Sequence, residues 1–214
     1  MEHEKYAELG EIVVKSAPQL YIDLDVEADG IAGRGSLLSV GAVSPWGETF
    51  YRELRPSSEL YIPSNRQFCE EHGLSRERLM DEGVDPAKAM RELAEWTNDL
   101  TGLYEKKAAV MSAFNASYDF PLINEAYLRT EQQNPFGIAG FCTKSIALAL
   151  DPHRYDWSAA RKNHLPDEIM PPGDFTHHAL EDAQYQQRLH FATVGYLIAG
   201  KDKSPPAGSF HGGE

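Results

Sequence analysis

The sequence predicts an α/β protein with a mixed central sheet and helices on both faces of that sheet. Three short apolar runs near the start, residues 20–26, 37–43 and 48–54, are joined by short links that contain glycine or proline. Such links favour antiparallel pairing, so the three runs predict a meander. A later apolar run, residues 106–113, lies between two helical segments, which is the pattern of a strand that joins the sheet in parallel.

The helical segments are indicated by the spacing of their apolar residues. Asp85-Pro86 opens the clearest one, in which Met90, Leu93, Thr97 and Leu100 share one face. Shorter signals predict helices over residues 65–72, 121–130, 144–150 and 179–198, and a short strand at 140–143.

We expect one folded domain over residues 20–199, because 214 residues suit one domain of ordinary to large size. Residues 1–19 are polar with a single apolar patch, and we expect them to form an extension outside the core fold. Residues 200–214 are rich in proline, glycine and serine, which is typical of a flexible tail.

The net charge of −13 restricts the partners of the chain. A protein that holds long nucleic acid by neutralising phosphates needs a basic face, and this composition does not supply a large one. A polyanionic substrate must therefore be gripped locally or through metal ions, and a short chain end suits this better than a long duplex. No apolar run reaches membrane-spanning length and no secretory signal is visible, so we expect a cytoplasmic protein without a membrane partner.

The stretch YIDLDVEADG, residues 21–30, carries one acid at every second position: Asp23, Asp25, Glu27 and Asp29. Side chains of an extended chain alternate between faces, so these carboxylates begin on the same side. Clustered carboxylates at the end of a buried strand suggest a divalent metal site, because a cation offsets their mutual repulsion. The alternative is a solvated acidic turn without function.

Two further acids follow in chain order, each at the boundary of a regular element. Asp119 lies at the start of a helix that follows a strand, and Asp182 lies near the start of the last helix, with His177 five residues before it. Side chains at such boundaries can converge on one edge of a sheet. We therefore treat Asp25, Glu27, Asp119 and Asp182 as one candidate set.

These motifs resemble those of a known family. DVEADG matches the opening motif D-x-E-x-x-G, FNASYD matches a second motif that usually reads H-N-x-x-x-D, and HHALEDA matches the third, H-x-x-x-x-D-A. Over residues 20–197 the chain thus resembles the DEDDh branch of the proofreading-type 3′-to-5′ exonucleases, which have a ribonuclease H-like fold. The resemblance implies a three-layer fold and hydrolysis of phosphodiester bonds at single-stranded 3′ ends, with release of nucleoside 5′-monophosphates.

The resemblance also implies roles for the motif residues. Two Mg²⁺ or Mn²⁺ ions would be held, with Asp25 bridging both, Glu27 and Asp182 completing one site and Asp119 supporting the other. His177 would take a proton from the attacking water. The five-residue spacing to the last aspartate selects His177 over its neighbour His178. The chain departs from the family at Phe114, where a histidine is common.

The contacts to the substrate are expected to come from several regions. The candidates are the backbone near Ala28, Leu37 or Leu38 as an apolar wedge, Phe114 and Asn115, and Arg154, Arg161 and Lys162 for phosphates. The alternative reading places the leucines in the core and the basic cluster on a solvated helix face. The partners expected are single-stranded DNA or RNA 3′ ends, or short oligonucleotides, and these residues do not choose between DNA and RNA. A homodimer is one assembly that the sequence allows.

Two alternatives to an exonuclease remain open at this point. IDLDV also resembles the D-x-D-x-[TV] motif of haloacid dehalogenase-like phosphatases, with Asp23 as nucleophile, Asp25 as acid and base, and Gly173-Asp174 as a later acidic motif. That reading leaves FNASYD and HHALEDA without a role. The other alternative is a catalytically degenerate nucleic-acid-binding module, although such modules typically lose at least one acid and this chain has all four.

Overall fold

A computed structural model describes residues 2–150, 157 and 165–200 of the chain. The three basic residues Arg154, Arg161 and Lys162, and nearly all of the expected tail, lie outside the described residues. The described elements are, in order, α1 (Glu2–Ser16), β1 (Leu20–Ala28), β2 (Leu37–Val43), β3 (Thr49–Glu53), α2 (Pro63–Glu71), α3 (Arg76–Glu82), α4 (Pro86–Leu103), β4 (Ala109–Ala113), α5 (Ala116–Arg129), β5 (Phe141–Cys142), α6 (Thr143–Leu150) and α7 (Ala179–Gly200).

The five strands form one mixed sheet in the order β3-β2-β1-β4-β5. β1 pairs antiparallel with β2, and β2 pairs antiparallel with β3, so the first three strands form the expected meander. β1 pairs in parallel with β4, and β4 pairs in parallel with β5. The predicted mixed sheet is therefore confirmed, and β1 is its central strand.

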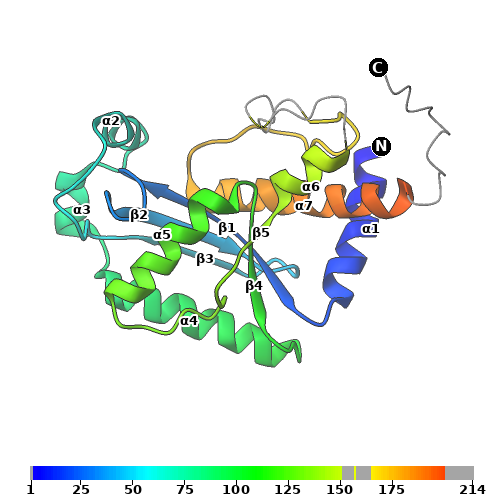
Figure 1. The fold of residues 1–214 in the computed structure, drawn as a ribbon, viewed down its shortest axis with the longest axis horizontal. Helices are drawn as coiled ribbons and strands as arrows, with labels where there is room; N and C mark the ends of the chain where they lie inside the picture. Colours follow the sequence, from blue (N-terminus) through cyan, green and yellow to red (C-terminus); the bar gives the residue numbers. More distant parts are fainter. Residues whose placement is uncertain (1, 151–156, 158–164, 201–214) are drawn as a thin grey trace, which may run out of the picture.

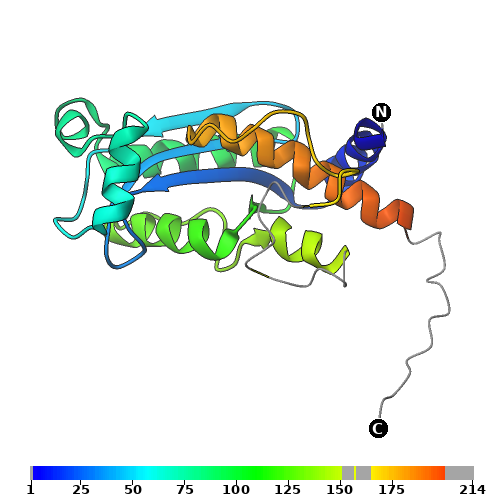
Figure 2. The ribbon, with the colours of Figure 1, turned by 90° about the horizontal axis from the view of Figure 1, so that it is seen from above.

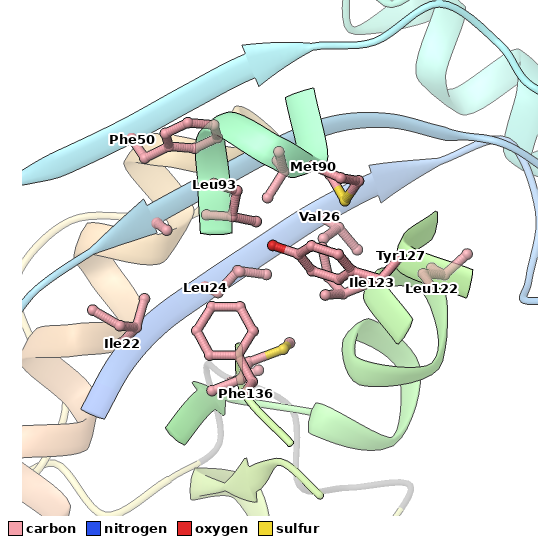
Figure 3. Close-up of a cluster of buried hydrophobic side chains, with 14 of the residues drawn as sticks. Ile22, Leu24, Val26, Phe50, Met90, Leu93, Leu122, Ile123, Tyr127 and Phe136 are labelled. Atoms are coloured by element: carbon pink, nitrogen blue, oxygen red, sulfur yellow. The ribbon is translucent and has the colours of Figure 1, made fainter. Parts of the chain in front are cut away.

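The two faces of β1 differ in chemistry and are covered by different helices. Ile22, Leu24 and Val26 point to one face, where they pack with Met90 of α4 and Ile123 of α5 (Figure 3). The opposite face of β1 is covered by α7, which runs along the other side of the strands (Figure 1). The chain thus has the three layers that the motifs imply, with an apolar core on one face of the sheet and the acids of β1 on the other.

The segment before β1 forms a helix, α1, that the sequence analysis did not expect. α1 crosses the C-terminal half of α7 (Figures 1 and 2), and the contact depends on a glycine from each helix. A Cβ atom on Gly10 would lie 1.8 Å from the Phe191 carbonyl oxygen, and one on Gly195 would lie 1.9 Å from the Tyr6 carbonyl oxygen. The two backbones can approach this closely only because both positions lack a side chain.

Two helices after β3 also differ from the expected boundaries. α3 is a short helix that the sequence analysis did not predict, and Ser75 caps it by accepting a hydrogen bond from the Arg78 amide at 3.2 Å. α5 was expected to begin at Pro121, but it begins at Ala116, and Pro121 lies inside it. The reason is that β4 leads almost directly into the helix: the Tyr118 amide donates to the Asn115 carbonyl at 2.8 Å and closes the first turn.

α7, with 22 residues, is the longest helix in the described part of the chain. Its buried side includes polar as well as apolar side chains, and Glu181 and Arg188 are exposed. Within residues 2–150, 157 and 165–200, no helix is both long and apolar enough to cross a membrane.

Candidate active site

The first two motif acids lie on the α7 side of β1. Asp25 and Glu27 are two residues apart in the strand and therefore share a face. The start of α7 reaches this face because β2 has a glycine opposite Asp25: a Cβ atom on Gly41 would lie 2.2 Å from the Leu180 amide nitrogen. The small residue in β2 therefore permits the close approach that brings Asp182 towards the acids of β1.

The other two acids come from the first turns of helices. Asp119 lies in the first turn of α5 and Asp182 in the first turn of α7, and both are buried, with 5% and 2% of their surface exposed. Carboxylates at helix N-termini are favoured by the unpaired backbone amides and by the helix dipole. This is a local reason for finding carboxyl side chains at these two buried positions.

Asp182 also fixes the loop that carries His177. One carboxylate oxygen of Asp182 accepts a hydrogen bond from the Thr176 amide at 2.8 Å, and the other accepts one from the His177 amide at 3.2 Å. His177 has a positive φ of 58°, which costs a non-glycine residue about 1–3 kcal/mol. The two hydrogen bonds to Asp182 hold this strained conformation in place.

The ring of His177 lies close to two of the acids and also contacts α2. A ligand atom from each of Glu27, His177 and Asp182 lies within 4.8 Å of the other two. The His177 ring makes edge contacts with Phe68 of α2 and with His72, the residue that follows α2, with ring centroids 4.7 Å apart in both pairs. The loop backbone and α2 thus place this ring beside the acids.

The neighbouring histidine has a different environment. The ring of His178 stacks on Tyr51 of β3 at 4.4 Å and does not line the cleft described below. The structure thus brings His177, and not His178, to the acids, which agrees with the choice made from the motif spacing.

The motif residues line one open cleft of about 770 Å³. Its lining includes Asp25, Glu27, Asp119, His177 and Asp182, together with Phe114 and Asn115 from the second motif. The five candidate residues therefore converge, although they come from β1, α5, α7 and the loop before α7. An arrangement of several carboxylate oxygens around one open space is the donor set that hard divalent cations prefer.

Gln186 is a cleft residue that the sequence analysis missed. Its amide nitrogen donates a hydrogen bond to Asp25, and its amide oxygen accepts one from the Phe114 amide at 2.7 Å. Gln186 is buried and lies one helical turn after Asp182, so it faces the same side of α7. This four-residue spacing was the signal that could have identified it.

Tyr118 connects the second motif to the glycine-containing loop after β1. Its hydroxyl donates a hydrogen bond to the Gly30 carbonyl at 3.1 Å. Burial, followed by the nearby charge of Asp119, raises the pKa of this hydroxyl, so it stays protonated and can donate. Tyr118 also lines the cleft and therefore helps to fix its wall.

The structure does not bring the expected leucines into the cleft. Leu37 is 6% exposed and belongs to the main core, and Leu38 is fully buried among Cys69, Leu74 and Leu79. The reason is that β2 is an inner strand with both faces covered. Ala28 is also buried at the end of β1 and does not line the cleft, whereas the expected contacts Phe114 and Asn115 do.

The two remaining acids of the first motif are buried in separate interactions. Asp23 accepts a hydrogen bond from the Nδ1 atom of His190 in α7 at 3.0 Å. Asp23 is on the same face of β1 as Asp25 and Glu27, but it is fully buried. Asp29 forms an ion pair with Arg76 of α3 and accepts a hydrogen bond from the Ser36 amide at 2.6 Å. Neither acid lines the cleft, so Asp23 is not placed as the nucleophile that the phosphatase alternative requires.

Comparisons with known proteins agree with this geometry. The family model that matches the sequence describes a 3′-5′ exoribonuclease Rv2179c-like domain, and it matches residues 20–194. The 3′-5′ DNA exonuclease Cap18 of Escherichia coli is 34% identical over 179 residues, which cover 82% of this chain and 92% of that protein. The chain belongs to the Rv2179c-like 3′-5′ exonuclease family.

Membership in this family identifies the chain as a 3′-5′ exonuclease and confirms the resemblance that the motifs indicated. Solved structures of other nucleases share its fold. The nuclease domain of 3′hExo, a DEDDh family member bound to rAMP, is 14% identical with a TM-score of 0.58, and the match covers 86% of this chain and 94% of that one. S. pombe Pop2p, in its Mg²⁺- and Mn²⁺-bound form, is 13% identical with a TM-score of 0.60, covering 92% and 91%.

A third structure, E. coli Exonuclease I in complex with a dT13 oligonucleotide, is 12% identical with a TM-score of 0.63, and the match covers 86% of this chain and 43% of that one. At these identities the likenesses show the fold. The chain therefore has the ribonuclease H-like fold of the DEDDh nucleases.

Proposed function

We propose that this exonuclease removes nucleotides from single-stranded 3′ ends with the help of two divalent ions, Mg²⁺ or Mn²⁺, and releases nucleoside 5′-monophosphates. The observation that carries the proposal is the convergence of Glu27, His177 and Asp182, whose ligand atoms all lie within 4.8 Å of one another. Asp25 and Asp119 line the same cleft, so every residue of the motif set faces one space.

The residues fit two divalent ions in both charge and chemistry. Asp25, Asp119 and Asp182 are all less than 10% exposed, and burying like charges together is costly unless a cation balances them. With Glu27 the set carries four negative charges, which match the four positive charges of two divalent ions. When bound, such ions would activate a water and stabilise the charge that develops on the attacking and leaving oxygens.

His177 is proposed as the general base. Its ring nitrogen would accept the proton of the attacking water and pass it to solvent through the open side of the cleft. The role requires a ring held at one place, and the hydrogen bond from the His177 amide to Asp182 and the contacts with Phe68 and His72 support this.

Whether the substrate is DNA or RNA is a separate question. The description of the family model names an exoribonuclease, whereas the name of the relative from Escherichia coli specifies DNA. The structural relatives were solved with rAMP in one case and dT13 in another. We therefore propose single-stranded nucleic acid, or short oligonucleotides, as the substrate class and compare both sugars in the same experiment.

The test is a degradation assay with 5′-labelled single-stranded DNA and RNA of the same sequence. With Mg²⁺ or Mn²⁺ we expect a ladder of products that shortens stepwise from the 3′ end, and with a chelator we expect none. Asp25→Asn and Asp182→Asn should abolish the ladder, whereas Asp81→Asn, which removes an exposed carboxylate of α3, should not. Stepwise degradation that persists in the chelator would contradict the metal mechanism.

A further inference from the structure

The side chains that line the cleft carry far more negative than positive charge. Five carboxylates line it: those of Asp25, Glu27, Asp119, Asp174 and Asp182. Metal ions would balance charge at the phosphate that is cut, but a substrate strand carries further phosphates beside it. Among the cleft-lining residues in the described part of the chain, Lys144 is the one lysine or arginine.

Lys144 lies on the β5 side of the cleft, away from the acids of β1. It belongs to the first turn of α6, and its backbone amide donates to the Phe114 carbonyl at 3.0 Å, which fixes α6 to the end of β4. β5, which leads into α6, is separated from β1 by β4. Two strand spacings amount to about 10 Å, so Lys144 begins well outside the group formed by Glu27, His177 and Asp182.

The ammonium group of Lys144 has no carboxylate partner among residues 2–150, 157 and 165–200. It lies 3.9 Å from the centroid of the Trp157 ring, and Lys144 forms no ion pair with the residues that the structure describes. Burial lowers the pKa of this ammonium, which means that its solvation is reduced. A ring face compensates a cation only in part, so an anion can still bind to it favourably.

Trp157 also lines a smaller hollow of about 300 Å³ next to this position, and the residue is 48% exposed. The contact with the ring restricts the flexible lysine stem before any ligand arrives. Less conformational entropy is then lost when the ammonium binds an anion. Lys144 is therefore a preorganised cation at the edge of an acidic cleft.

We propose that Lys144 binds a backbone phosphate of the substrate strand next to the phosphate that is cut, and that Trp157 holds its ammonium in place. This inference rests on the proposed nuclease function and adds a length requirement to it. A dinucleotide has a single phosphodiester and cannot use Lys144, whereas a trinucleotide has two. The enzyme should therefore prefer trinucleotides and longer strands over dinucleotides.

The test compares kcat/KM on a trinucleotide with kcat/KM on a dinucleotide of the same bases. In Lys144→Met, which keeps an apolar stem over Trp157 but removes the charge, we expect the ratio of the two values to fall about tenfold, the usual size of one charged hydrogen bond. The slope of log KM against log salt concentration for a longer strand should fall by about one. Lys144→Arg should restore most of the ratio, and Lys107→Met, which removes an exposed charge outside the cleft, should match the wild type.

A trinucleotide-to-dinucleotide ratio in Lys144→Met equal to that of the wild type, including the case in which both substrates lose kcat/KM by the same factor, would overturn the inference. If Lys144→Met does not fold, as judged by thermal unfolding, Lys144→Gln provides the same comparison. Absence of metal-dependent cleavage by the wild-type protein would instead contradict the proposed function itself.

Discussion

The side-chain amide of Gln186 donates a hydrogen bond to the carboxylate of Asp25. The orientation of this side-chain amide is fixed, because its oxygen accepts a hydrogen bond from the Phe114 backbone N–H, a group that can only donate. The end of β4 therefore determines which atom of Gln186 faces Asp25. One residue of α7 thus aligns the acid that is expected to bridge both metal ions.

Replacing Gln186 should weaken metal binding more than it weakens folding. Gln186→Met keeps the size of the side chain and removes both hydrogen bonds, and partners of metal ligands typically contribute 10–100-fold to metal affinity or activity. We expect the half-saturating Mn²⁺ concentration to rise by about tenfold or more, measured both by activity and by calorimetry of metal binding without substrate. Gln184→Met, on the same helix but outside the cleft, is the control. Equal metal affinities in the two variants would remove Gln186 from this role.

His177→Ala should lower kcat by about 10²- to 10⁴-fold, the usual contribution of a general base. His178→Ala removes a ring that stacks on Tyr51 outside the cleft and should keep most of the rate. Single-turnover measurements on a 5′-labelled strand would compare the two. A His177→Ala variant with the full wild-type rate would exclude His177 as the base.

Asp23→Asn should reduce stability while preserving catalysis. Asp23 and His190 are both buried. Asn at position 23 can still accept a hydrogen bond from His190, but it brings an NH2 donor into a site where the carboxylate only accepts, and a buried donor without an acceptor costs about 1–3 kcal/mol. We expect the free energy of unfolding in urea to fall by that amount, with Asp99→Asn on the surface of α4 as the control. The phosphatase alternative makes the opposite prediction, since it requires Asp23 as the nucleophile. Complete loss of activity in a folded Asp23→Asn protein would therefore favour that alternative.

Arg76→Met should destabilise the loop that follows the first motif. Asp29 is fully buried and pairs with Arg76, so removal of the arginine leaves an uncompensated buried charge, which costs about 3–5 kcal/mol. Urea unfolding of Arg76→Met and of Arg55→Met, whose side chain is exposed, would measure the difference. Equal stabilities would show that the ion pair does not anchor this loop.

The strands and the motif residues were predictable because their signals are local. Asp25 and Glu27 end an apolar run, and Asp119 and Asp182 each lie close to a boundary that the sequence marks. The order of these boundaries suggested that the four acids could meet at one edge of the sheet, and the resemblance of the motifs to the DEDDh exonucleases made the set specific.

The features that were missed depend on packing between distant segments. α1 is stabilised by its contact with α7, through Gly10 and Gly195, and its own sequence is mostly polar with a single apolar patch. Leu37 was a candidate wedge, but it lies in β2, which pairs with β1 on one side and with β3 on the other, and its side chain is buried. Lys144 has no motif around it, and only the fold places it in the cleft.

The measurement that tests the central claim most directly is anomalous diffraction from crystals of the protein soaked in Mn²⁺. The account predicts two manganese peaks, about 4 Å apart, within the cleft, with Asp25, Glu27, Asp119 and Asp182 as ligands. Crystals of Asp25→Asn soaked in the same way should lose at least one peak. Manganese bound only elsewhere on the wild-type protein, or no manganese in the cleft at all, would contradict the account.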